Sequence, residues 1–446
     1  MIQKFGDILE SADLRRKILF TLGSLAIFRL GAAIPIPGIN GEALRALFEA
    51  QRNGFLGFLN IFSGGALGRF SIFSLGVMPY INASIIISLI QGAHMIPYFD
   101  RLAKEGELGR RKLNSWTRYL TLGLGAIQSA GLTWSITSMR SVPGSPPIVP
   151  HPTASFYAMT TLTLTTGTLF VMWLGEQMTE YGIGNGVSLI IFAGIVQRLP
   201  SAIMGMIALV HAEEIGIIKA LLIAAGILFV TLLVVWLETA QRKIPVQYAK
   251  RVVGRRLYGG AQSYLPLKVD QSGVIAVIFA ISLLTVPVTV ANFFPQSSWA
   301  QKLNQYFSLG GWIYQAVYAA LIIFFCYFYN SVSINPDDLA DNMKKSGGFI
   351  PGYRPGEATA KYIEWVLERI TLGGALFVAA IAVLPDVMRR QFNVPFFFGG
   401  TALLIVVGVA LDTMGQLEAQ LIMRHYEGFL KRGRIRQRWF NVGSAS

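Results

Sequence analysis

The residue types that usually carry catalysis or bind metals are sparse in this chain. Its four histidines stand singly, without the spacing of metal ligands, and its one cysteine, Cys326, lies in an apolar stretch typical of a small packed side chain. The sequence lacks the glycine-rich ATP loop, the H-E-x-x-H zinc motif and the G-x-S-x-G nucleophile motif. A glycine-rich segment at 182–186 has no preceding strand, which indicates a tight turn rather than a dinucleotide site. The sequence therefore argues against an enzyme, and no cofactor or metal is expected.

One stretch of backbone is unusual instead. The run Phe62-Ser63-Gly64-Gly65-Ala66-Leu67-Gly68-Arg69-Phe70 stands directly before a long apolar stretch, 71–95. Lipid cannot hydrogen-bond to irregular backbone, so such a run must be buried in protein or line a water-filled cavity. The sequence therefore predicts an enclosed cavity or pore, with this run in it or over it.

The composition is that of a membrane protein. Of the 446 residues, 53% are hydrophobic and only 14% are charged, and the mean hydropathy is +0.51. Soluble domains usually carry about 25% charged residues. Because an ordinary soluble core could not hide this much apolar surface, we expect an all-α integral membrane protein with many spans.

Ten apolar segments approach the roughly 20 residues that a helix needs to cross the hydrocarbon core. They are residues 18–37, 71–95, 119–136, 155–174, 187–210, 217–237, 274–293, 312–329, 370–384 and 394–411. The fifth contains Pro200, where the span is expected to stop and continue as a short interfacial helix. The ninth is short and is expected to extend back through residues 362–365.

Lys and Arg residues fall unevenly on the two sides of these spans. With both termini in the cytoplasm, most of them lie in cytoplasmic segments, as the positive-inside rule predicts, and topology explains much of the net charge of +14. Residues 1–212 and 213–446 each hold five spans. An odd number of spans gives the halves opposite orientations, which predicts an inverted repeat with a functional site between the halves.

Two cytoplasmic loops, at about 241–268 and 335–361, are longer than topology requires. The first carries Lys250, Arg251, Arg255 and Arg256, and the second carries Arg354. One interpretation is a solvated linker with topology charges. The other, which we favour, is a docking surface for an acidic partner or a phosphate backbone.

A different class of function also deserves a test. An ion-coupled transporter needs a carboxylate near the membrane midplane, and Asp412 is the candidate. Its place near the cytoplasmic end of the tenth span favours a residue at the helix end instead. Apolar pairs such as Val77 with Ile81, and Val187 with Ile191, share helix faces, but packing or lipid contact explains such pairs equally well.

Several motifs occur together along nearly the whole chain. They are residues 62–67, 71–81, 104–107, 173–177, 182–186, 265–268, 351–357 and 398–401. In this order they closely resemble the SecY/Sec61-alpha family, whose bacterial members are the channel-forming subunits of the Sec protein translocase.

The resemblance implies a ten-helix channel of two inverted five-helix halves with an hourglass pore, and a passive role rather than an enzymatic one. Such a channel translocates unfolded secretory polypeptides and releases transmembrane segments sideways into lipid. Residues at about 59–70 match the family's plug, which includes the glycine-rich run. The apolar ring at the waist would comprise Val77, Ile81, Val187, Ile191, Ile278 and Ile405, and a lateral gate would comprise Asn82, Gln128, Ser282 and Val286.

The resemblance also implies partners. The family channel works with the subunits SecE and SecG, and its energy comes from the SecA ATPase or from the ribosome, including ribosomal RNA, at the cytoplasmic loops. Lys250, Arg251, Arg255, Arg256 and Arg354 match that docking region. Signal peptides, nascent chains and anionic membrane lipids are further expected partners. The expected location is the bacterial inner membrane, with both termini cytoplasmic.

Overall fold

The computed structural model describes most of the chain, in a mainly helical fold. Outside the described residues are 1–11, 51–59, 61–62, 93–95, 139–146, 214–215, 249–250, 254–255, 259–261, 294–296, 307–310, 393–399 and 441–446. Within the described part, seven helices are long and apolar enough to cross a membrane. The predicted multi-span helical membrane protein is therefore confirmed.

Each of the ten predicted spans coincides with a helix or a pair of helices. The N-terminal spans are α2 (Ala12–Gly31), α5 (Met78–Gly92), α7 (Glu107–Ser138), α8 (Ala154–Tyr181) and the pair α9 (Gly186–Val196) and α10 (Leu199–His211). The C-terminal spans are α11 (Ile217–Thr239), α12 (Val274–Phe293), α14 (Trp312–Ser333), α16 (Glu357–Phe392) and α17 (Gly400–Phe440). Shorter helices connect them: α3 (Gly41–Ala50), η1 (Leu67–Arg69), α6 (Pro97–Lys104), α13 (Ser298–Tyr306) and α15 (Pro336–Lys345).

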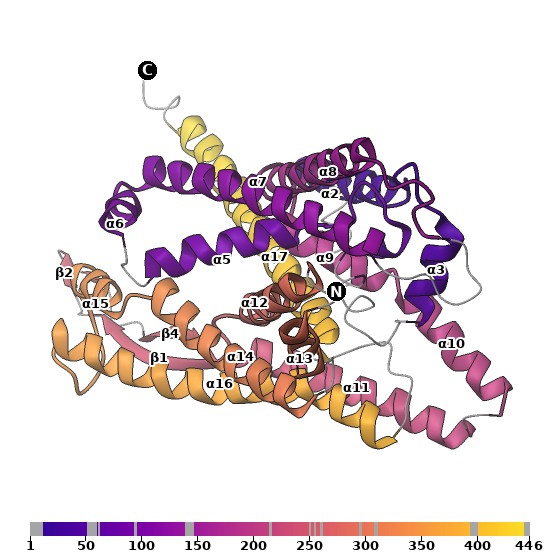
Figure 1. Ribbon diagram of the computed structural model, residues 1–446. Helices are drawn as coiled ribbons and strands as arrows, with labels where there is room; N and C mark the ends of the chain where they lie inside the picture. The colour runs from indigo at the N-terminus through magenta and orange to yellow at the C-terminus, as the bar shows by residue number, and fades with distance from the viewer. Residues whose placement is uncertain are drawn as a thin grey trace.

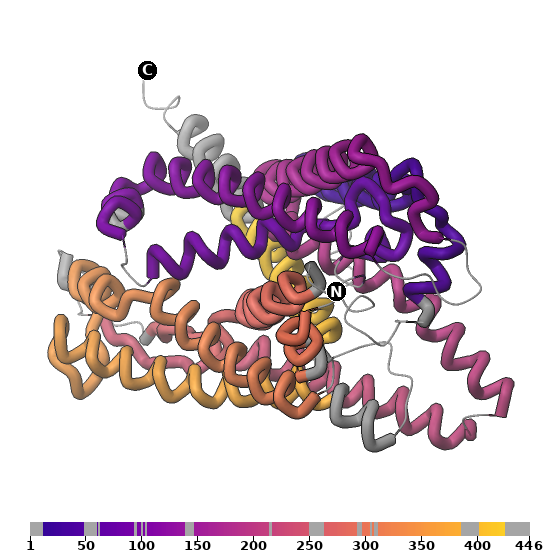
Figure 2. The backbone as a smooth tube through the Cα atoms, viewed as in Figure 1, coloured from indigo at the N-terminus to yellow at the C-terminus, as the bar shows by residue number. Residues whose placement is uncertain are grey.

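The N-terminal and C-terminal helices form two layers. Figure 1 shows α5, α7 and α8 in one layer, α14 and α16 in the other, and α12 and α17 between them. The layers meet where α5 and α7 contact α12, and where α9 contacts α17. The tube in Figure 2 shows the same division by colour, with purple helices above and orange helices below. The largest apolar core lies at this meeting of the two layers.

The second span differs from its prediction, because its helix begins at Met78 rather than at residue 71. Residues 71–77 form turns instead, in which the Ser74 hydroxyl donates to the carbonyl oxygens of Ser71 (2.6 Å) and Ala66 (3.2 Å). Such local hydrogen bonds compete with helix formation. The 15 residues of α5 rise only about 22 Å, less than the hydrocarbon thickness of about 30 Å. Protein accordingly encloses the irregular part, with Ser71, Phe73 and Ser74 buried.

The fifth span breaks as expected, although slightly earlier. Helix α9 ends at Val196, and Pro200 lies in the first turn of α10, where its missing N–H costs no helical hydrogen bond. The ninth span extends back as predicted, because α16 begins at Glu357.

The two long loops, at about 241–268 and 335–361, are joined by a sheet that the sequence did not predict. Strand β1 (Gln241–Tyr248) pairs antiparallel with β4 (Gln262–Lys268) on one edge and with β5 (Gly348–Phe349) on the other. Strands β2 (Arg251–Val253) and β3 (Arg256–Tyr258) form a separate hairpin. Ile244 and Leu267 of the sheet pack with Ile350 and with Ile363 of α16. The loops therefore form one folded base rather than two separate linkers.

Candidate functional site

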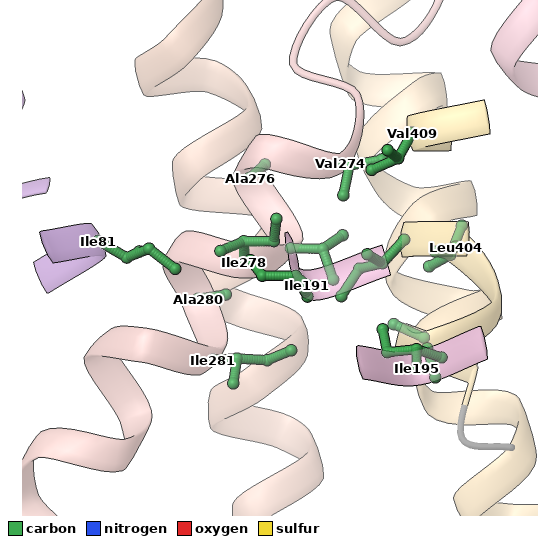
Figure 3. Packing of buried hydrophobic residues seen from close by; sticks show 14 of the residues in the cluster. Ile81, Ile191, Ile195, Val274, Ala276, Ile278, Ala280, Ile281, Leu404 and Val409 are labelled. Atoms are coloured by element: carbon green, nitrogen blue, oxygen red, sulfur yellow. The ribbon is translucent and has the colours of Figure 1, made fainter. Parts of the chain in front are cut away.

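The six residues predicted for the ring come together in the core between the layers. Val77, Ile81, Ile191, Ile278 and Ile405 are buried members of one apolar cluster, and the half-buried Val187 packs against it. Figure 3 shows Ile81, Ile278 and Ile191 close together, projecting from α5, α12 and α9. The structure thus brings apolar side chains from α5, α9 and α12 together, and their role as the ring of a pore stays a prediction.

A cavity of about 400 Å³ opens directly against these apolar side chains. Ile81, Val187, Ile191 and Ile278 form its apolar end. Its remaining wall is largely polar and includes Tyr80, Ser84, Asn114, Arg118, Glu176, Glu180 and Ser188. The structure thus places a water-accessible vestibule against the ring. Sequence reasoning assigned no role to Arg118 or Glu176, although Glu176 belongs to the motif at 173–177.

The plug segment lies against the other end of α9. A Cβ atom built on Gly64 would lie 3.1 Å from the Cα atom of Gly194, and the φ angle of Gly64 is +63°. Both the close approach and the left-handed backbone favour glycine at this position. The guanidinium of Arg29 on α2 donates from Nη1 to the Gly64 carbonyl oxygen at 2.8 Å. Of the plug predicted at about 59–70, residues 59, 61 and 62 (the last being Phe62) lie outside the described part of the chain.

The rest of the plug is well packed. Leu67 and Phe70 are buried in a second apolar cluster with Ile36, Leu44 and Leu164. The Ser63 hydroxyl accepts from the Leu67 N–H at 3.1 Å, and the Asn60 side chain accepts from the Gly68 N–H at 2.8 Å. Arg69, at the end of the plug segment, has an exposed side chain. The charged side chain that contacts the plug backbone is that of Arg29. Mobility of this segment stays a prediction.

The predicted gate residues lie on the helices where the two layers meet. Asn82 on α5 and Ser282 on α12 are buried, Gln128 on α7 is half-buried, and Val286 on α12 is 39% exposed. The Ser282 hydroxyl lies 3.9 Å from the Met78 sulfur of α5, which is a direct contact between the layers. The role of all four residues as a gate stays a prediction.

The start of α12, which carries Ile278 and Ser282, is held by Asp270. Its Oδ1 accepts from the Ser272 hydroxyl at 2.9 Å and from the Gly273 N–H at 2.8 Å. Burial raises the pKa of the Asp270 carboxyl, and these two hydrogen bonds oppose the rise. The carboxyl thereby fixes the entry of the chain into α12.

The expected docking residues are only partly described. Lys250 and Arg255 lie outside the described residues, while Arg251 and Arg256 occupy strands β2 and β3. Arg354 is exposed in the turn between β5 and α16. Beside it, the rings of Tyr353 and Tyr362 stack with their centroids 4.2 Å apart.

The glycine-rich segment at 182–186 is a tight turn, as predicted. It makes hydrogen bonds to α2 and α17 and caps the start of α9. The Ile183 N–H donates to the Thr21 hydroxyl of α2 at 3.1 Å, and the Gly184 N–H donates to the side-chain oxygen of Gln416 on α17 at 3.0 Å. The Asn185 side chain caps α9 by accepting from the Ser188 N–H at 3.2 Å. The turn therefore positions α9, and with it Val187 and Ile191, against both layers.

Comparison with known proteins identifies the family. The family model described as SecY matches residues 71–414, and the chain is 47% identical to protein translocase subunit SecY of Escherichia coli strain K12 over 427 residues, 95% of each chain. The chain belongs to the SecY family. SecY of Halalkalibacterium halodurans is 49% identical over 443 residues, which are 97% of this chain and 100% of the relative. The predicted resemblance is confirmed.

Solved structures agree on the fold. The chain is similar to a structure described as a protein conducting channel, with a TM-score of 0.66 and 18% identity over 91% of this chain and 92% of that chain. It is also similar to Sec61 in the canine ribosome-channel complex, with a TM-score of 0.61 and 17% identity over the same shares. At such identities the likeness concerns the fold alone, and it confirms the predicted SecY architecture of ten helices in two halves. Membership of the SecY family makes the chain a channel subunit and not an enzyme.

Proposed function

We propose that this chain forms the conducting path of a protein translocase, in which Val77, Ile81, Val187, Ile191, Ile278 and Ile405 close the waist. Its relatives are named protein translocase subunit SecY, and translocation of polypeptides is the function of this SecY chain too. The observation that carries the proposal is the apolar ring at the end of a polar vestibule. An apolar constriction can dewet and block ions at rest, while its lack of fixed polar partners lets it fit many passing side chains.

The plug closes the same path on the side away from the vestibule. It comprises about residues 59–70, with Ser63, Gly64, Gly65 and Ala66 as its small-residue part. A solved relative, similar in fold with a TM-score of 0.65, is described as a SecY whose plug domain stabilises the closed state and maintains a membrane seal. The close approach of Gly64 to Gly194 supports the same role here.

The two halves, 1–212 and 213–446, move apart at a lateral gate that includes Asn82, Gln128, Ser282 and Val286. An apolar segment in the path then partitions into lipid, because burial of apolar side chains away from water is favourable. The contacts of α5 and α7 with α12 support this position for the seam.

Partner proteins supply the energy for translocation and complete the channel. The folded cytoplasmic base, with Arg354 exposed on it, receives the ribosome or the SecA ATPase, and SecE and SecG complete the channel. Solved fold relatives are described as ribosome-bound complexes, which supports the ribosome as a partner. The chain lies in the bacterial inner membrane with both termini in the cytoplasm.

The alternative of an ion-coupled transporter rested on Asp412. This side chain is exposed on α17 rather than enclosed at the core of the helix bundle. The family match also favours the channel.

Substitution of the ring tests the proposal. Ile191→Ser and Ile278→Ser place a hydroxyl in the constriction, and each should raise ion leakage through proteoliposomes several-fold and relax the requirement for a good signal sequence. The control is Ile190→Ser on the same helix α9, because Ile190 is equally buried but packs toward Gly175 of α8 and does not line the cavity. Unchanged conductance and secretion in both ring variants would contradict the ring assignment.

A further inference from the structure

An ion pair stands in the wall of the vestibule. The Arg118 guanidinium of α7 donates from Nε to Glu176 Oε1 of α8 at 3.0 Å, and its Nη2 lies 2.9 Å from Glu176 Oε2. The pair is therefore bidentate, which is the strongest geometry for arginine and carboxylate. Both residues line the same cavity as Ile81, Ile191 and Ile278. A polypeptide that approaches the ring must pass them.

The pair holds most of the charge near the ring. Among the described residues that line the cavity, Arg118, Glu176 and Glu180 carry charge, and the others are neutral, such as Ser84, Asn114 and Ser188. The side chain of Glu176 is 21% exposed and that of Arg118 is 53% exposed, so water screens the pair only in part. Each partner therefore cancels a charge that would otherwise face the path.

We propose that the Arg118–Glu176 pair determines which charges pass the ring: while it is intact, the vestibule wall keeps only the single negative charge of Glu180, and neither cationic nor anionic segments of a passing chain are strongly retained. The inference rests on the proposed function. Loss of one partner changes the net charge beside the path by one unit: to two negative charges without Arg118, and to none without Glu176. An uncompensated charge in a confined, partly desolvated cavity attracts opposite charge over about 10 Å and is screened by salt.

The proposal predicts opposite effects from the two single neutral variants. Arg118→Gln leaves Glu176 and Glu180 unbalanced, so it should slow a Lys-rich segment roughly fivefold relative to an acidic one. Glu176→Gln leaves Arg118 balanced by Glu180, so the wall loses its net negative charge and the Lys-rich segment should become faster relative to the acidic one. The double variant Arg118→Gln/Glu176→Gln should return the ratio of the two rates close to that of the unmodified chain.

A purely structural role, in which the pair only clamps α7 to α8, predicts something else. Arg118→Lys keeps the charge but loses the bidentate geometry. Under the proposal Arg118→Lys behaves like the unmodified chain, whereas under the clamp it behaves like Arg118→Gln. The matched control is Arg111→Gln, which breaks the exposed Arg111–Glu107 pair on the same helix and outside this cavity.

The test measures translocation of three secretory chains into proteoliposomes that hold the assembled channel. The chains differ only in one internal segment, which is Lys-rich, Asp/Glu-rich or neutral. Opposite shifts in the two single variants, reduced by added salt, would support the proposal. Equal slowing of all three chains, or no change in the ratio, would overturn it. The neutral chain reports transport itself, so a failure of the proposed function would show as no transport even in the unmodified channel.

Discussion

At the scale of single residues, the main surprise is which arginine contacts the plug. In the sequence, Arg69 lies near the end of the glycine-rich run, whereas Arg29 lies in the first predicted span. The structure shows Arg69 exposed and Arg29 bonded to the Gly64 carbonyl. The two bonded residues are 35 positions apart, so no local pattern could pair them.

Loss of the Arg29 contact should loosen the plug. Arg29→Ala leaves the Gly64 carbonyl without this donor, and a hydrogen bond to a charged group typically contributes about 1.5–3 kcal/mol. We expect ion leakage through the resting channel to rise several-fold, with little change in active translocation. The measurement is conductance of channels in planar bilayers. Arg69→Ala is the control, from the same region and with an exposed side chain, and an equal leak in both variants would show that the Arg29 contact does not seat the plug.

At the scale of elements, hydropathy predicted the spans well because a helix in lipid must satisfy its own backbone and present apolar side chains. It placed α12 and α14 to within a few residues of their ends. It failed at 71–77, where serine hydroxyls and the neighbouring plug hold an apolar sequence in turns. It also missed the sheet, since Gln247 of β1 pairs with Phe349 of β5, about a hundred residues away along the chain. The sequence of a charged loop does not reveal that it pairs with a strand so far away along the chain, or that the two strands bury apolar side chains together.

The sheet and the stacked tyrosines hold the turn that carries Arg354. The Tyr353–Tyr362 stack is worth about 0.5–1.5 kcal/mol beyond area burial, and the Thr359 hydroxyl donates to the Arg354 carbonyl oxygen at 2.8 Å. A loss of about 1 kcal/mol corresponds to roughly fivefold weaker binding, so Tyr362→Ala should weaken the proposed binding of SecA or ribosomes by about that factor, while Tyr362→Phe should bind normally. Equilibrium binding to the purified channel measures this. If Arg354→Ala loses binding and Tyr362→Ala does not, the stack has no part in orienting Arg354.

At the scale of the whole molecule, the proposed conducting path lies where two layers of helices meet, and few polar contacts cross that boundary in the described part of the chain. Met78 touches Ser282 between α5 and α12, and the Gly184 N–H donates to the Gln416 side chain of α17. Much of the remaining contact is apolar packing, to which Ile, Val, Leu and Ala side chains contribute most. Non-directional packing of this kind lets the halves slide or part without leaving buried polar groups unpaired.

Joining the two layers covalently should therefore stop the channel. In a Cys326→Ser background, which removes the chain's one native thiol, Met78→Cys with Ser282→Cys places two thiols where side-chain atoms now lie 3.9 Å apart. Oxidation or a short thiol crosslinker should block both translocation and lateral release, and reduction should restore them. The control is Ser129→Cys with Thr165→Cys, whose hydroxyl oxygens are 2.8 Å apart on α7 and α8 within one layer. Crosslinking of the control pair should leave transport intact. Normal transport with the seam crosslinked would mean that polypeptides pass without separation of the layers at α5 and α12.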